Sequence, residues 1–99
     1  MTVYVIAQIK FTREEYYRRY QSRFADVFKS FKGRLLVADE NPKVLDGEFT
    51  RNKVVVMEFP DEGEAMRFLD SPAYQEISKD RIAGADTLSL LVKGLLSPL

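Results

Sequence analysis

Few side chains in this sequence could carry chemistry, because the chain contains neither cysteine nor histidine. Their absence excludes thiolate nucleophiles, disulfides and zinc–sulfur sites, and it removes the commonest general base and metal ligand. The acidic run around Asp61 and Glu64 resembles a metal cluster, but these two residues also fit a helix N-cap. We therefore expect no metal and no bound cofactor, and any chemistry must rest on carboxylates, phenols and basic groups.

Glu58 is the first candidate for a catalytic acid or base. It lies near the end of the apolar run Lys53–Phe59, and Arg34 is expected on the same face of a neighbouring strand. A partly buried carboxylate with a raised pKa could orient a substrate or exchange a proton with it. The alternative is a cross-strand ion pair between Glu58 and Arg34 at the polar rim of an interface. Both explanations stay open.

Tyrosines and arginines are the candidates for ligand contacts. Tyr4 and Tyr74 could offer phenol donors to a small polar ligand, and Arg34 could anchor an anion beside Glu58. The planar fork of Arg81 matches a carboxylate or phosphate. Arg81 could equally serve as a helix-end charge that complements the helix dipole.

Composition limits the classes of partner. The 15 basic and 15 acidic residues cancel, so no overall field attracts nucleic acid or an anionic membrane. The basic and aromatic segment 16–20 is better explained as one turn of an amphipathic helix with exposed ion pairs. No apolar run is long enough to span a bilayer, and the first residues do not resemble a signal peptide. We expect one cytoplasmic domain over residues 1–99.

The first half of the chain predicts a strand, a helix and a second strand. Residues 3–9 alternate as a strand does, and Thr12 with Glu15 forms a capping box for a helix. An apolar stripe then continues to Phe31 at helical spacing. Gly33 is expected to end that helix in a left-handed conformation, and residues 34–38 form the next strand.

The second half predicts two further strands and a broken helix. Asp46-Gly47 indicates a tight hairpin between residues 43–45 and 48–50, and residues 53–59 form the clearest strand. A helix capped by Asp61 should break at Asp70-Ser71 and restart with Pro72 at its first position. A last strand covers residues 87–92. The order β-α-β-β-α-β predicts an α+β, ferredoxin-like fold with a four-stranded antiparallel sheet and both helices on one face.

The sheet face opposite the helices is predicted to form a dimer. Side chains alternate across a strand, so each strand divides into a face covered by helices and an open face. The open face is expected to carry an apolar centre with a polar margin, the centre being Ile6, Leu36, Val54, Val56 and Leu91. A monomer would leave this patch in water, and a second copy is the simplest cover because a two-fold interface is self-complementary.

The chain resembles a known family, the domain of unknown function 1330 family of the dimeric α+β barrel superfamily. The resemblance rests on motifs spread over nearly the whole sequence, namely Tyr20, Gly33-Arg34, Leu45-Asp46-Gly47, residues 54–60, Ser71-Pro72-Ala73-Tyr74-Gln75 and Arg81. It implies a ferredoxin-like protomer, a dimer formed by packing sheet on sheet, and a pocket between sheet and helices. It implies no established reaction.

Two functions are consistent with these features. The first is a dimeric protein acting on an unidentified small molecule as a cofactor-independent enzyme, with Glu58 as acid or base and with Tyr4, Arg34, Tyr74 and Arg81 as ligand contacts. The second is a non-catalytic module that binds a metabolite or only dimerises. Nucleic acid and membranes are not expected as partners.

Overall fold

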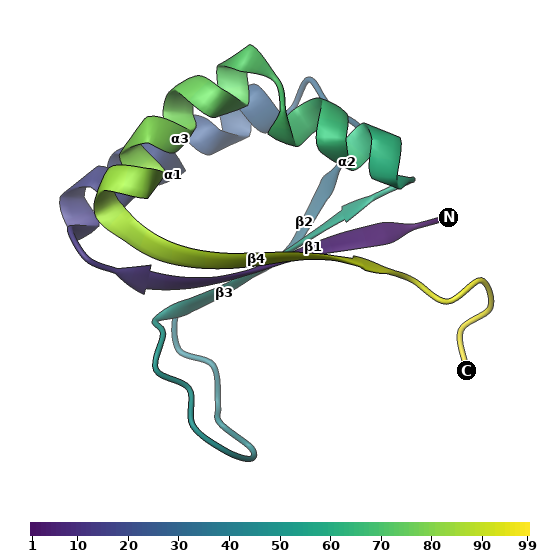
Figure 1. Ribbon diagram of the computed structural model, residues 1–99, viewed down its shortest axis with the longest axis horizontal. Coiled ribbons are helices and arrows are strands. Elements are labelled where there is room, and N and C mark those ends of the chain that lie inside the picture. Colours follow the sequence, from purple (N-terminus) through teal and green to yellow (C-terminus); the bar gives the residue numbers. More distant parts are fainter.

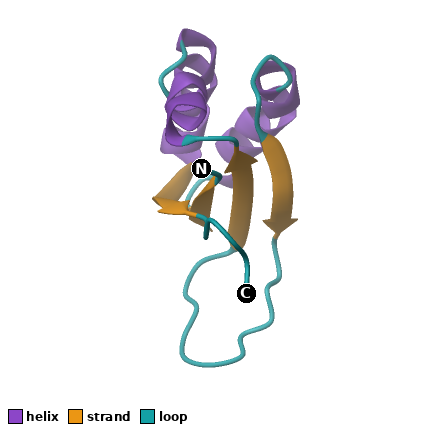
Figure 2. Ribbon diagram, turned by 90° about the vertical axis from the view of Figure 1, so that its right-hand side faces the viewer, coloured by secondary structure: helices purple, strands orange, loops and turns teal.

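The computed structural model describes residues 1–99 and contains four strands and three helices. The elements follow in the order β1 (Val3–Phe11), α1 (Glu14–Phe28), β2 (Arg34–Asp39), β3 (Lys53–Phe59), α2 (Glu62–Leu69), α3 (Pro72–Gly84) and β4 (Ala85–Lys93). The strands form one antiparallel sheet in the order β2-β3-β1-β4, and the helices cover one face (Figures 1 and 2). The predicted ferredoxin-like α+β fold is confirmed. None of the helices has the length and apolar character needed to cross a membrane.

The break in the second helix is confirmed. The Asp61 side chain accepts a hydrogen bond from the Glu64 amide (2.8 Å) and caps α2, which ends at Leu69. The Ser71 hydroxyl accepts from the Tyr74 amide (3.2 Å), and Pro72 opens α3 where its missing N–H has no partner to lose. The sequence thus marks both helix starts with side chains that satisfy free amides.

The predicted start of α1 is wrong. Arg13 occupies the N-cap position without a side-chain cap, and Thr12 lies outside the helix. The amides of Thr12 and Arg13 both donate to the Gly84 carbonyl at 3.0 Å, so a tertiary contact with the end of α3 satisfies this backbone instead. The helix also ends at Phe28, about one turn earlier than the stripe to Phe31 predicts.

Gly33 does not adopt the predicted left-handed conformation, which occurs only at Gly47. Gly33 instead permits a close approach: a Cβ atom there would lie 2.6 Å from the Phe59 ring and 2.7 Å from the Phe28 ring. Gly47 has a φ of +81°, as a tight turn requires, but residues 43–45 and 48–50 do not pair as strands. An isolated two-stranded ribbon is marginal in water, and no third strand supports this one. Residues 40–52 form a long loop, the arm, which projects from the open face (Figure 1).

The register reverses the predicted faces of β4. Ala7 pairs with Val55 and Ser89, and Ile9 pairs with Lys53 and Thr87, so Thr87, Ser89 and Leu91 face the helices. Leu88, Leu90 and Val92 therefore lie on the open face, and the placement of Leu91 there was wrong. The prediction assumed that the more apolar of the two alternating sets of side chains in each strand faces the helices. In β4 this set lies on the open face, which is itself apolar.

A β-bulge also changes β2. Leu35 pairs with Met57, but Leu36 and Val37 together oppose Val56, so the alternation slips by one residue. Ala38 consequently faces the helices and Val37 faces outward. Nothing in the local sequence of β2 marks this slip.

The closely packed part of the core is an aromatic cluster between α2 and the sheet. Phe59 and Phe68 are both 0% exposed, and their ring centroids lie 5.8 Å apart. The Phe68 ring also packs against Phe28 (5.1 Å) and Tyr74 (4.4 Å). Large rings fill this half of the space between the sheet and the helices. A binding site would therefore have to lie in the other half.

Candidate functional site

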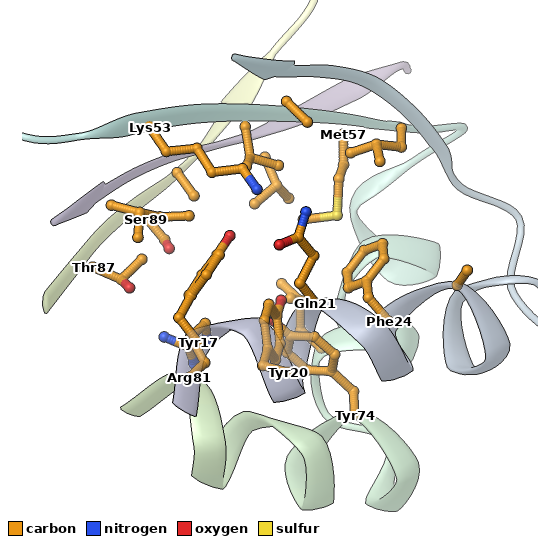
Figure 3. A pocket seen from close by; sticks show the side chains of 18 of the residues that line it. Tyr17, Tyr20, Gln21, Phe24, Lys53, Met57, Tyr74, Arg81, Thr87 and Ser89 are labelled. Atoms are coloured by element: carbon orange, nitrogen blue, oxygen red, sulfur yellow. The ribbon is translucent and has the colours of Figure 1, made fainter. Parts of the chain in front are cut away.

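A cavity of about 430 Å³ lies between the helix-facing side of the sheet and the helices (Figure 3). Pockets that hold small molecules typically measure about 300–1,000 Å³. All seven helices and strands contribute lining residues, which are Val5, Ala7, Ile9, Tyr17, Tyr20, Gln21, Phe24, Ala25, Leu35, Ala38, Lys53, Val55, Met57, Leu69, Asp70, Tyr74, Gln75, Arg81, Thr87 and Ser89.

Small side chains in the floor of the sheet explain why this space is empty. One row across the four strands consists of Ala38, Val55, Ala7 and Ser89. The neighbouring row consists of the larger Leu35, Met57, Val5 and Leu91. Protein interiors are otherwise close-packed, so a row of short side chains beneath α1 leaves a hollow. The bulge in β2 is what brings Ala38 into this row.

Polar groups gather at one end of the cavity. Lys53, Thr87 and Ser89 extend there from the sheet, and Tyr17 and Arg81 extend from α1 and α3 on the opposite wall (Figure 3). Lys53 is only 3% exposed, which is rare for a charged residue without a partner. The opposite end is lined mainly by apolar groups, including Phe24, Met57 and Leu69, and the polar residues Gln21, Asp70 and Gln75 also contribute to the lining.

The base of the arm supplies the partner of Lys53. Its Nζ atom lies 3.4 Å from Glu40 Oε2 and 5.0 Å from the centroid of the Tyr17 ring. Arg18 donates two hydrogen bonds to Glu40, at 2.6 and 2.7 Å. The hydrogen bond from Arg18, supported by Lys53, lowers the pKa of Glu40 to about 2, and Glu40 in turn raises the pKa of Arg18. Glu40 and Arg18 are therefore charged throughout the physiological range.

Tyr17 and Tyr20 remain protonated at neutral pH. Burial, reinforced by Glu40, raises the pKa of Tyr17 to about 12. Burial and the neighbouring Tyr74 also raise the pKa of Tyr20, and the two hydroxyls share a hydrogen bond at 3.0 Å. These phenols are therefore donors or neutral acceptors, and they are poor bases at pH 7.

Two buried polar atoms at the polar end have no partner in the protein: Arg81 Nε and Thr87 Oγ1. Both residues line the cavity. Native structures leave few buried donors unpaired, because each one costs about 1–3 kcal/mol of desolvation. An unpaired donor facing a cavity indicates a binding partner, either solvent or ligand.

The structure separates the predicted site residues into two groups. Arg81 and Tyr74 line the cavity. Tyr4 and Glu58 alternate with cavity-facing residues of β1 and β3, so they lie on the open face, where Arg34 pairs with Glu58. Arg34 Nε lies 3.3 Å from Glu58 Oε1. The sheet therefore stands between Glu58 and Arg81.

Sequence reasoning missed the polar residues that the sheet contributes to the cavity, namely Lys53, Thr87 and Ser89. The signal for Lys53 is its alternation with Val55 and Met57, which places a cation on the covered face. Thr87 and Ser89 carry a similar signal only once the register of β4 is known. The described residues contain no group of three or more acidic, histidine or cysteine side chains that could hold a metal ion.

Solved structures of similar fold come from several organisms. A protein of unknown function from Rhodopseudomonas palustris superposes with a TM-score of 0.81 at 18% identity, over 97% of this chain and 84% of that one. SnoaB, a cofactor-independent oxygenase from Streptomyces nogalater, gives 0.68 at 13% identity, over 97% and 95%. A dimeric ferredoxin-like protein of unknown function from Jannaschia sp. CCS1 gives 0.72 at 11% identity, over 95% and 100%. At these identities the likeness extends to the fold alone.

Family membership follows from the sequence itself. Among curated proteins, none matches this chain. A family model, in contrast, matches residues 2–95, almost the whole chain. The chain therefore belongs to the family described as Domain of unknown function (DUF1330).

Proposed function

We propose that this protein is a homodimer in which each copy binds a small, largely apolar molecule in the cavity between its sheet and helices. The observation that carries the proposal is the 430 Å³ cavity itself, with mainly hydrophobic walls and a few polar groups at one end. Concave apolar sites with few, localised polar groups are typical of small-molecule binding. The row of small residues supports it further, because a purely structural domain gains stability by filling such a space.

The open face supports the dimer. One row across it, Val37, Val56, Ile6 and Leu90, is entirely apolar. Leu90 is 50% exposed and Leu88 is 44% exposed in the single copy. Single exposed apolar residues are ordinary, but a contiguous row over four strands is typical of an interface. A dimeric ferredoxin-like protein among the similar structures favours the same arrangement.

The arm offers a second contact for the partner copy. It projects on the side of the open face (Figure 2), and it carries Val44 and the 87%-exposed Leu45. Its base is anchored, because Arg51 donates to the Asp86 carbonyl at 2.8 Å and Asn52 Oδ1 accepts from the Phe11 amide at 2.8 Å. An anchored arm with an apolar tip is suited to pack against the second copy.

Catalysis is the further candidate, favoured by one observation. The cavity offers cations and neutral hydroxyls near Tyr17, a set that stabilises negative charge on a bound molecule without any cofactor. SnoaB, of similar fold, is a cofactor-independent oxygenase. Glu58 remains a proposed acid or base, and from the open face it would act in the dimer interface. A cytoplasmic location, and the absence of nucleic acid and membranes among the partners, remain predictions.

Filling the cavity tests the binding proposal. In Ala7→Leu, three further carbon atoms occupy the floor of the cavity, whereas Ala83→Leu adds the same atoms at an exposed position of α3. We expect small aromatic molecules to raise the melting temperature of the parent and of Ala83→Leu, and to lose this effect in Ala7→Leu. Equal stabilisation of all three proteins would show that the cavity is not the binding site.

A further inference from the structure

The polar end of the cavity has the donors of an anion site. We propose that Lys53, Arg81 and Thr87 bind the carboxylate of a planar aromatic acid whose ring system occupies the apolar end. This inference rests on the proposed function, because it specifies the class of ligand that the same cavity holds. It goes beyond the family assignment, which names no ligand.

Arg81 is the central donor. Its Nε is buried without a partner, no carboxylate lies within ion-pair distance, and its guanidinium carbon lies 6.0 Å from the centroid of the Tyr20 ring. The aromatic ring accepts none of the in-plane hydrogen bonds of the guanidinium. A carboxylate can take two parallel hydrogen bonds from such a group, which a single hydroxyl or carbonyl oxygen cannot.

Lys53 and Thr87 stand on the sheet on either side of Ile9. These three residues form one row across β3, β1 and β4, so the two polar residues arise about 10 Å apart. In Figure 3 the Lys53 amine points into the cavity toward the Tyr17 hydroxyl, and Thr87 and Ser89 lie to one side of it. Thr87 Oγ1 is buried without a partner and Lys53 has one carboxylate neighbour for three donors, so both retain capacity for ligand oxygens.

The charges at this end match a monoanion. The cations are Arg18, Lys53 and Arg81, and the carboxylates paired with them are Glu40 and Glu14. A net charge of +1 therefore remains. A carboxylate neutralises this charge, whereas a phosphate dianion would leave a net charge of −1. The acidic residue of the lining itself, Asp70, precedes the start of α3, roughly 15 Å along the helix from Arg81.

The apolar part of the cavity favours a flat ring system. Tyr20, Phe24 and Tyr74 present aromatic surfaces from the helices, and Met57 faces them from the sheet. The Tyr20 and Phe24 rings lie 5.9 Å apart and edge to face, which leaves ring faces and edges for a further aromatic partner. The thioether of Met57 adapts to such a ring.

Paired acids and amides test the proposal. Benzoate, 2-naphthoate and anthracene-9-carboxylate are titrated into the protein by calorimetry, each beside its uncharged primary amide. We expect the acid of at least one pair to bind about tenfold or more tightly than its amide, since charge-assisted hydrogen bonds are the stronger ones. In Arg81→Gln and in Lys53→Met this preference should fall about tenfold, whereas Arg23→Gln, which removes the same charge from an exposed position of α1, should retain it.

The outcomes separate this inference from the proposed function. If amides bind as tightly as acids and Ala7→Leu abolishes both, the cavity binds small molecules but the anion site is wrong. If no acid or amide binds, or if Ala7→Leu leaves binding unchanged, the cavity proposal itself fails. Cooperative thermal unfolding of each variant establishes that a lost preference does not reflect a lost fold.

Discussion

Leu90 is expected to be a major contributor to the dimer. It lies in the apolar row of the open face and is 50% exposed in one copy. Full burial of a leucine side chain contributes about 1.5–3 kcal/mol, so covering the exposed half contributes about 1 kcal/mol per copy. The two-fold axis doubles each contact, and Leu90→Ala should therefore weaken the dimer by about 2 kcal/mol, or about thirtyfold in dissociation constant.

Sedimentation equilibrium from nanomolar to micromolar concentration measures this change directly. Leu90→Glu should shift the protein to the 11.4 kDa monomer at all concentrations, because the charge would be desolvated in the interface without a partner. Ile82→Ala is the matched control, since Ile82 is an exposed apolar residue of α3 on the helix side. A parent protein that sediments as a stable monomer at micromolar concentration would contradict the dimer. Equal effects of Leu90→Ala and Ile82→Ala would show that the open face is not the interface.

Three further predictions concern the protomer. Thr87→Val removes a buried hydroxyl without a partner at constant shape, so it should stabilise the unliganded protein by about 1 kcal/mol and raise the melting temperature by about 4–8 °C in calorimetry; a lower melting temperature would contradict this. The pKa of Tyr17 is about 12 in the folded protein and near 10 in the unfolded chain. The contribution of Tyr17 to the free energy of unfolding is therefore complete below pH 10 and is lost as the pH rises to 12. In urea titrations at pH 9, 10 and 11, the stability lost by pH 11 should be about 1.3 kcal/mol larger in the parent than in Tyr17→Phe, and identical pH profiles would refute this. A Cβ at Gly84 would lie 2.5 Å from the Tyr17 amide nitrogen, so Gly84→Ala should lower stability by about 2 kcal/mol or more; an unchanged melting temperature would count against the close approach.

Local side-chain chemistry explains which parts of the fold were predictable. Asp61 and Ser71 satisfy free amides within their own helices, so the helix starts and the break between them follow from neighbouring residues alone. Thr12 belongs to the same class of residue, yet its cap is absent because the Gly84 carbonyl, far away in the chain, accepts from the backbone at that point. The hairpin at Gly47 failed similarly: the turn formed, but nothing supports the flanking strands.

The candidate site was less accessible to sequence reasoning than the fold. Arg81 and Tyr74 were identified as ligand contacts, and both line the cavity, although their role remains a proposal. Glu58, Arg34 and Tyr4 were assigned to the same pocket, but the pleat places them on the far side of the sheet. Position along a strand determines only that alternate residues share a face, and the covered face must be known before a site can be assembled.

By itself, the sequence determined the order of elements, the N-caps of α2 and α3, the absence of thiol and imidazole chemistry, and family membership. These depend on residue identity and on contacts within a few positions. Only the tertiary structure decided the register of β4 and the slip in β2, which turn Thr87, Ser89 and Ala38 toward the helices. It also decided that short side chains from four strands fall in one row. A cavity is a property of that row and of the helices above it, because an empty volume exists only where side chains from distant segments fail to meet.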